Sequence, residues 1–269
     1  MFDVKIIGNN ASNNWLVRQF EIMKFSDTAL EEKFIPRPDI SIVFHFKDSP
    51  LIRSEKNIQL EPFFLAPIIP SSLVLNFHGE MDTFIAICKP TVFTRIFNLD
   101  LTPVNKRSID LPPAIFSKLW TELSRLDTTQ ERIHHFTAFI NSFQQTPYQP
   151  DAVDIFYDKM IENSAAVPIH KLARECPACK RTLERNFIKR TGVTPKVLMR
   201  IIRLNHLLSH LNDPITIDYQ ELVFDGHYFD QAHFIKDFKS IICETPGYFF
   251  NRNLQIAKMF SGKQEGTIR

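Results

Sequence analysis

The spacing of apolar residues changes near residue 110, and this change divides the chain into two structural halves. In the segments 40–46, 73–77 and 83–89, every second residue is a large or medium apolar one. A period of two is typical of β-strands that have one buried face. Short strands at such short intervals predict a β-sandwich or partial barrel over about the first 110 residues.

Beyond Asp110 the apolar residues recur every three or four positions, which is the spacing of a helix. Asp110 is the expected N-cap of a first helix, whose apolar stripe runs from Ile115 to Leu123. Thr128 and Glu131 fit a capping box at the start of a second helix, which reaches Phe143. We interpret this helix pair as a packing or dimerisation element.

A polar segment with two prolines, QQTPYQPD at 144–151, is the expected domain boundary. Charge changes sign soon after it. Residues 1–167 hold 16 lysines and arginines against 20 acidic residues, whereas residues 168–269 hold 16 against 10. The basic half is therefore the candidate for an anionic partner. We expect an α+β chain of two domains, a strand-rich one at 1–145 and an all-α one at 151–260.

Consecutive short helices are predicted in the second domain, at 152–163, 169–175 and 180–190, followed by a longer helix that runs from Thr194 as N-cap and Pro195 to residue 211. The stretch CPAC leaves only a short turn between the second and third of these helices, which predicts a helix-turn-helix. A second such pair is drawn through 219–224 and 230–240, and a last helix begins at Pro246.

Two strings carry a resemblance to a known family. The first, IHKLARECPACKRTLERNFIKRTGVTPKVLMRIIRLNHLLSHL, starts at Ile169, and the second, YFDQAHFIKDFKSIICETPGYF, spans 228–249. They resemble the two helix-turn-helix modules and the linker helix of AraC/XylS-family transcription regulators. The resemblance implies that two recognition helices enter successive major grooves of DNA, about 34 Å apart.

The resemblance also implies a role for each exposed position. The base-reading residues would be Arg181, Glu184 and Arg185 in the first module, and Gln231, Ala232, His233 and Lys236 in the second. The phosphate contacts would be Lys180, Lys189, Arg190, Lys196 and Lys239.

The chain departs from the family pattern at both turns. Pro177 stands where a glycine is usual, and Cys179 replaces the usual Ser or Thr N-cap of the first recognition helix. In the second module, His227 and Tyr228 replace a glycine-aromatic pair, and Cys243 occupies the place of a later glycine. Because a positive φ is harder for residues with a Cβ, we expect the second module either to be strained or to read DNA loosely.

Residues 1–145 resemble the cupin-like N-terminal domain of one AraC-type subgroup, through PDISIVFHF, FHGEMDTFIAICKPTVFTRIF and ERIHHFTAFINSF. The resemblance implies a domain that senses a small-molecule effector, dimerises, or does both. A pocket among Phe44, Phe46, Phe77 and Phe84 would suit an apolar effector, although these rings are favoured as core.

Cys176-Pro177-Ala178-Cys179 has the spacing of a redox motif, and a thiol at a helix N-terminus beside Lys180 and Arg181 should have a lowered pKa. No βαβ pattern surrounds it, so Cys176 and Cys179 remain candidates for redox sensing or for ordinary turn residues. His45 and His78 stand alone, and His134 and His135 point to different helix faces, so no metal site is predicted.

The sequence therefore predicts a cytoplasmic transcription regulator, with double-stranded DNA as its partner and no enzymatic activity, catalytic residue, cofactor, metal or membrane segment. Family resemblance adds RNA polymerase as a partner and an activator role, with a monomer or homodimer as the assembly. The alternative is a ligand-binding or thiol-active protein that uses the CPAC motif.

Overall fold

The computed structural model describes most of the chain, and every structural statement below concerns this part. The described residues are 2–9, 14–26, 29–102, 107–143, 147–163, 167–210, 223–224, 226, 228–250 and 266–268.

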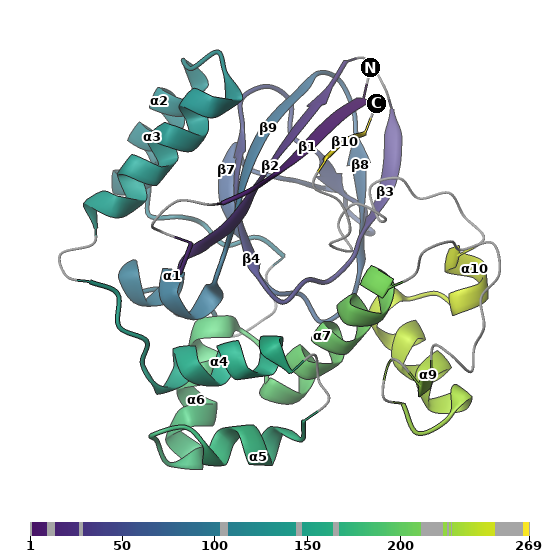
Figure 1. The fold of residues 1–269 in the computed structure, drawn as a ribbon. Helices are drawn as coiled ribbons and strands as arrows, with labels where there is room; N and C mark the ends of the chain where they lie inside the picture. The colour runs from purple at the N-terminus through teal and green to yellow at the C-terminus, as the bar shows by residue number, and fades with distance from the viewer. Residues whose placement is uncertain are drawn as a thin grey trace.

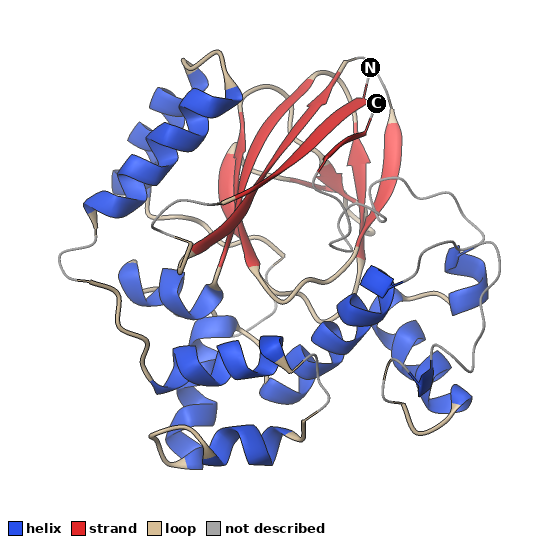
Figure 2. Ribbon diagram, in the orientation of Figure 1, coloured by secondary structure: helices blue, strands red, loops and turns tan. Residues whose placement is uncertain are grey.

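Two antiparallel sheets form the N-terminal half, as the alternating segments predict (Figures 1 and 2). The six-stranded sheet has the order β10 (Gly266–Ile268), β1 (Phe2–Gly8), β2 (Val17–Phe25), β9 (Met81–Cys88), β4 (Ile40–His45), β7 (Phe63–Ala66). The four-stranded sheet has the order β3 (Leu30–Phe34), β8 (Leu73–Phe77), β5 (Leu51–Ile52), β6 (Ile58–Gln59).

Strand β4, second from one edge of the six-stranded sheet, is buried at all of its positions, although its alternating pattern predicts one buried face. Ile42 and Phe44 face one hydrophobic cluster, and Val43 between them belongs to the cluster on the other side. Both faces are covered because the four-stranded sheet packs on one of them and helices pack on the other. The polar side chains of Ser41 and His45 are consequently buried as well.

Three helices follow β9, namely α1 (Pro90–Ile96), α2 (Pro113–Ser124) and α3 (Thr129–Ser142), and the pair α2 and α3 lies along one side of the sandwich (Figure 1). Phe136 of α3 packs 5.8 Å from Phe84 and 6.1 Å from Phe44, measured between ring centroids. The capping box of Thr128 and Glu131 is confirmed. The N-cap predicted at Asp110 is wrong, because α2 begins at Pro113 with Pro112 as its N-cap.

The C-terminal half is helical, with starts close to those predicted. It comprises α4 (Ala152–Glu162), α5 (Ile169–Arg174), α6 (Lys180–Thr191), α7 (Pro195–His210), α9 (Gln231–Ile242) and α10 (Pro246–Phe250). Of the predicted helix at 219–224 only residues 223–224 are described, and they are helical.

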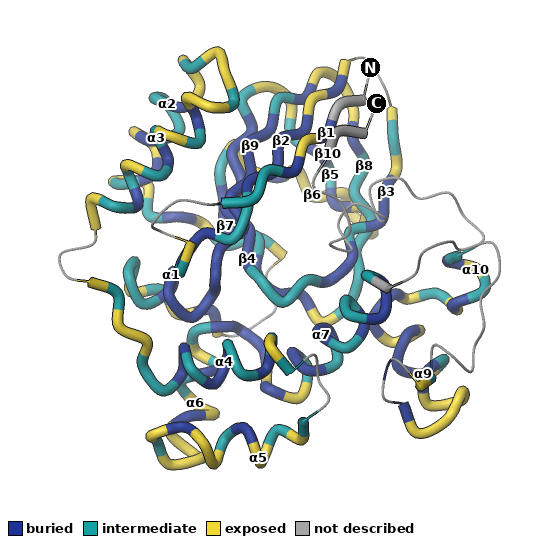
Figure 3. Tube along the Cα trace, in the orientation of Figure 1, coloured by how far each residue is buried: buried dark blue, intermediate teal, exposed yellow. Residues whose placement is uncertain are grey.

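The two halves share one hydrophobic core. A single cluster of buried residues includes Phe84 in the sandwich, Phe93 in α1, Phe156 in α4 and Phe187 in α6. Figure 3 shows buried segments running from the strands through α1 into α4 and α7. The Tyr157 hydroxyl of α4 also donates to the backbone oxygen of Pro38, at 3.1 Å. The boundary expected at 144–151 therefore falls between segments that pack closely together.

None of the helices in the described part of the chain is long and apolar enough to cross a membrane.

Candidate nucleic-acid interface

The first helix-turn-helix consists of α5, a short turn and α6. Leu172 of α5 and Leu183 and Phe187 of α6 are buried, and the Phe187 ring lies 5.3 Å from that of Phe156 in α4. The opposite face of α6 is solvent-exposed and carries Lys180, Arg181, Glu184 and Arg185. The predicted base-reading residues of this module thus share one exposed face near the start of a helix.

The turn after α6 fixes the direction of the linker helix α7. Gly192 ends α6 in the left-handed region, with φ of 76°, a conformation that favours glycine. The Thr191 hydroxyl donates within this turn, with acceptors at Phe187 O (2.8 Å) and Val193 O (3.0 Å). Thr194 Oγ1 accepts from Val197 N at 3.3 Å, so Thr194 caps α7 as predicted.

The five predicted phosphate contacts differ in their surroundings. Lys180, Lys189, Lys196 and Lys239 are exposed. Arg190 is not, because its guanidinium lies 2.6 Å from Asp151 Oδ2, with its side chain only 20% exposed. Arg95 of α1 lies 3.3 Å from the same carboxylate oxygen. Arg190 therefore joins α6 to α4 and α1 in this structure, which favours a structural role for it.

The second recognition helix is α9. Asp230 caps it by accepting from His233 N at 2.7 Å, and Phe234 and Phe238 face inward. The outer face of α9 carries the remaining predicted base readers, all exposed, which are Gln231, Ala232, His233 and Lys236.

An ion pair that sequence reasoning missed joins the second module to α7. Arg200 Nε lies 2.5 Å from Asp237 Oδ1, and the Tyr228 hydroxyl lies 3.2 Å from Asp237 Oδ2. The Arg203 guanidinium lies 5.1 Å from the centroid of the Tyr228 ring. Asp237 could have indicated this ion pair from the sequence. It stands directly before Phe238 on the inward stripe of α9, and a buried acidic side chain requires a partner.

A groove of about 740 Å³ separates the two modules, and its lining includes Lys196, Arg200, Arg203, His233 and Lys236. This set is mostly cationic, as expected for a surface that faces a phosphate backbone.

The turn cysteines are both free thiols, in different environments. Burial raises the pKa of the Cys176 thiol, whose sulfur lies 3.4 Å from Leu172 O. Cys179 is exposed, and its hydrogen bonding with Thr182 lowers the pKa of its thiol. Cys179 is the N-cap residue of α6 with ordinary extended angles, so the substitution there introduces no positive φ.

Strain in the second module is found at Cys243, which ends α9 in the left-handed region with φ of 65°. Only Asn98 is a further non-glycine residue with positive φ in the described part of the chain. Tyr228 is buried, while His227 lies outside the described residues.

The four phenylalanines considered for an effector pocket do not line a common cavity, in agreement with the favoured interpretation that they are core residues. Phe44 and Phe84 pack against Phe136, and the ring of Phe46 lies 4.2 Å from the Arg132 guanidinium. Only Phe77 of the four lines the cavity found between the sheets. No cluster of three metal-binding side chains occurs among the described residues.

Two helix-turn-helix recognition helices, held by one continuous linker helix, define a DNA-binding protein. The comparison with protein families agrees, because residues 172–252 match the model of a helix-turn-helix domain. The C-terminal region is a helix-turn-helix domain of the AraC type, and the protein is a DNA-binding transcription regulator.

No curated protein matches the chain. The solved structures similar to it include three of ToxT from Vibrio cholerae. One has a TM-score of 0.46 at 11% identity and covers 87% of this chain and 97% of ToxT. A second, bound to (E)-4-(8-methylnaphthalen-1-yl)but-3-enoic acid, has a TM-score of 0.47 at 11% identity, covering 93% and 98%. A third, bound to an unsaturated fatty acid, has a TM-score of 0.44 at 15% identity, covering 93% and 94%.

Proposed function

We propose that this protein binds specific sites in double-stranded DNA through both modules and that its N-terminal domain controls the binding. One observation carries the proposal: α6 and α9 each expose the predicted base-reading face, and both helices contact the single helix α7. A rigid linker fixes the spacing of two recognition helices, and this spacing determines which pairs of half-sites fit.

The recognition residues divide by chemistry. Arg181 and Arg185 can each bond two acceptors of a guanine, and Gln231 can bond adenine in the same bidentate way. Glu184 can accept from the amino group of cytosine. Lys180, Lys189, Lys196 and Lys239 have no planar fork, so they serve as phosphate contacts that hold the protein in register.

The sensory role of the N-terminal domain depends on a cavity between the two sheets, which is lined mainly by apolar side chains. Pockets of this kind, with few polar groups, commonly bind small molecules. Because the sandwich and the first module share a core, a change in the sandwich can reach α6 through α1 and α4. We place the protein in the cytoplasm, with RNA polymerase as its partner and an activator role, in a monomer or homodimer.

The experiment is a selection of bound fragments from the parent genome with the full-length protein, followed by affinity measurements on the recovered site. Log affinity should fall linearly with log salt, with a slope near −0.9 for each phosphate neutralised. Arg53→Ala is the control, because Arg53 is exposed on the sandwich and pairs with Glu31 there. Recovery of no common sequence, or an affinity that does not change with salt, would rule out the proposal.

A further inference from the structure

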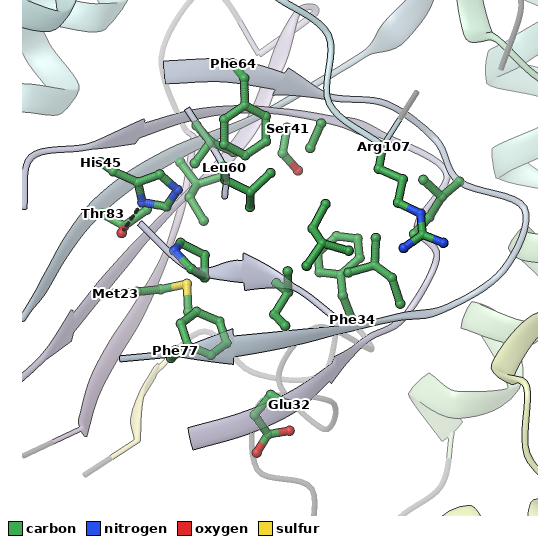
Figure 4. A pocket seen from close by; sticks show the side chains of 18 of the residues that line it. Met23, Glu32, Phe34, Ser41, His45, Leu60, Phe64, Phe77, Thr83 and Arg107 are labelled. Carbon is green, nitrogen blue, oxygen red and sulfur yellow. Dashed lines mark hydrogen bonds between the residues drawn. The ribbon is translucent and has the colours of Figure 1, made fainter. Parts of the chain in front are cut away.

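The cavity between the two sheets has a volume of about 80 Å³. It lies on the side of the six-stranded sheet that faces the four-stranded one, and Figure 4 shows the side chains around it. Met23, Leu60, Phe64 and Phe77 form much of its apolar wall. An apolar cavity of about 150 Å³ holds benzene, so this one accepts a smaller molecule without movement of its walls.

Three polar side chains interrupt the apolar wall. Ser41 and His45 lie on the same face of β4, four residues apart, and Thr83 of β9 is directly opposite His45 in the strand register. His45 is only 4% exposed, and its Nδ1 lies 2.8 Å from Thr83 Oγ1. Figure 4 shows that the other ring nitrogen points away from Thr83, toward the open part of the cavity.

That nitrogen, Nε2 of His45, has no hydrogen-bond partner among the residues that the structure describes. Leaving a buried polar group unpaired is energetically costly, so such groups are rare and each requires a partner. A ligand with a hydrogen-bonding group at this end of the cavity would supply one.

The charge state of His45 restricts which hydrogen-bonding group of a ligand can pair with it. Burial lowers the pKa of His45 to about 4, so the ring is neutral at physiological pH. A neutral ring offers one donor and one acceptor nitrogen, and the hydroxyl of Thr83 can pair with either. A ligand hydroxyl likewise fits both tautomers, whereas a carboxylate would bring an uncompensated charge into the apolar end.

The charged groups around the cavity have partners elsewhere or lie away from His45, as Glu32 does in Figure 4. Glu21 accepts from Arg37 at 2.5 Å, and Lys33 pairs with Glu244 of the second module. Arg107 is exposed and lies across the cavity from His45 in Figure 4. The His45 end is therefore suited to a neutral head group.

We propose that the cavity binds a small, mostly apolar alcohol and that His45, held in place by Thr83, recognises its hydroxyl group. The ligand has about five non-hydrogen atoms, which is somewhat more than the cavity holds without movement, and the flexible side chain of Met23 makes the additional room. This inference deepens the effector role proposed above and rests on it for its regulatory meaning. Lys33 lines the same cavity and donates to Ile242 O of α9 at 3.0 Å, which connects the site to the second module.

The test compares 1-butanol with n-pentane, which has the same shape with a methyl group in place of the hydroxyl. Both are titrated into the full-length protein carrying ¹³C-methyl methionine and ¹⁵N-histidine labels. The Met23 methyl signal reports occupancy by either molecule, and the His45 nitrogen signals report a bond to the hydroxyl. We expect 1-butanol to bind up to about tenfold more tightly than n-pentane and to shift the His45 Nε2 signal.

His45→Phe should abolish the preference for the alcohol, while Thr137→Val, which removes a buried hydroxyl on α3 outside the cavity, should leave it unchanged. Equal binding of both probes, no binding of 1-butanol, or an unshifted His45 signal overturns the proposal. The nitrogen shift is measured on the unaltered chain, so the test does not depend on the folding of His45→Phe. DNA binding is measured separately without alcohol, so failure of the regulator function is distinguished from failure of the ligand site.

Discussion

On the exposed face of α6, neighbouring basic side chains are expected to make two different kinds of DNA contact. Arg185 is exposed and about one and a half turns from the helix start, within reach of base edges in the groove. Arg185→Ala should cost about 1–3 kcal/mol of binding free energy on the selected site and relax discrimination at one base pair. Titration of a panel of single-base variants of the site measures both effects.

Lys189→Ala provides the matched comparison on the same helix. As a phosphate contact, Lys189 should strengthen binding to all sequences alike, so its loss should leave base preference unchanged and reduce the salt slope by about 1. An unchanged affinity and base preference in both variants would place the DNA-facing surface elsewhere.

The buried His45 makes the stability of the protein depend on pH. Its pKa is about 4 in the folded protein and about 6.5 in an unfolded chain. Below pH 6.5 the unfolded chain takes up a proton that the folded ring does not, so stability is complete above pH 6.5 and is lost as pH falls toward 4. The total contribution is about 3 kcal/mol.

Denaturant unfolding at pH 7, 6, 5 and 4 checks this prediction, with His45→Phe as the variant that lacks the titrating ring. The difference in unfolding free energy between the two proteins should shrink or reverse as the pH falls. His134→Gln, at an exposed position of α3, is the control that should follow the unaltered protein. A difference that stays constant with pH would show that His45 does not titrate as stated.

At the scale of elements, the turn between α5 and α6 holds two thiols of opposite character. Cys179 is exposed with a lowered pKa, whereas Cys176 is buried with a raised one. Because the thiolate is the reactive form, iodoacetamide should label Cys179 much faster than Cys176 in the folded protein, as mass spectrometry of peptides would show. Comparable labelling of both thiols before unfolding would contradict the environments described here.

DNA affinity is expected to be the same in mild oxidant and in thiol reductant, since Cys176 is held against Leu172 O and is poorly placed to react. A fall in affinity on oxidation that is reversed by reductant, and that Cys176→Ala abolishes, would instead show a redox switch in this turn.

The joint between α7 and α9 is formed by Arg200, Asp237 and Tyr228. Among the contacts between elements, it has the clearest consequence for DNA recognition. Asp237 is bound by both Arg200 and Tyr228, with its side chain only 8% exposed. Asp237→Ala should lower the stability of the second module by about 2 kcal/mol, the typical value of a hydrogen bond to a charged group. Because α9 would then be held less firmly to α7, discrimination should fall more at the second half-site than at the first.

Footprinting of both half-sites measures that effect, and Arg200→Ala should reproduce it. Lys239→Ala, on the exposed face of the same helix, should instead weaken binding to all sequences without a half-site bias. Equal losses at the two half-sites in Asp237→Ala would show that the joint does not control their spacing.

Element starts with a local chemical signal could be predicted from the sequence. The capping residues are Thr128, Thr194 and Asp230. Each accepts a hydrogen bond from a backbone N–H three residues further on, so its role follows from the adjacent sequence. The start of α2 was misplaced because Pro112 and Pro113 set it without a side-chain cap. The roles of Arg190 and His45 depend on Asp151 and on a strand partner 38 residues away, and no local pattern encodes those contacts.

At the scale of the whole molecule, both modules of the DNA-binding half are attached to the sandwich. In the first module, Leu101 N donates to Lys189 O at 2.9 Å, and Arg95 of α1 pairs with Asp151 and Asp154 of α4. In the second, Ser72 donates from its backbone to Ile241 O and from its hydroxyl to Ile242 O, both at 2.6 Å. These contacts hold both modules against the sandwich. The polar segment with two prolines at 144–151 does not predict such contacts.

A fragment that begins at Asp151 tests whether the DNA-binding half folds alone. Removal of the sandwich takes away the partners of the buried Tyr157 hydroxyl at Pro38 and Asp39 and deprives α6 of its backbone bond to Leu101. We therefore expect a fragment that is helical by circular dichroism but unfolds at a lower temperature than the full chain. It should keep the base preference of the full chain with weaker affinity, because the base-reading faces are intact while the support of α9 at Ser72 is lost.

Ser72→Ala in the full chain isolates the loss of the hydroxyl bond from the loss of the core, and should reduce affinity less than truncation does. A fragment with no helix would show that 144–151 does not separate two folding units, and one as stable as the full chain would show that the shared core contributes nothing to the helical half.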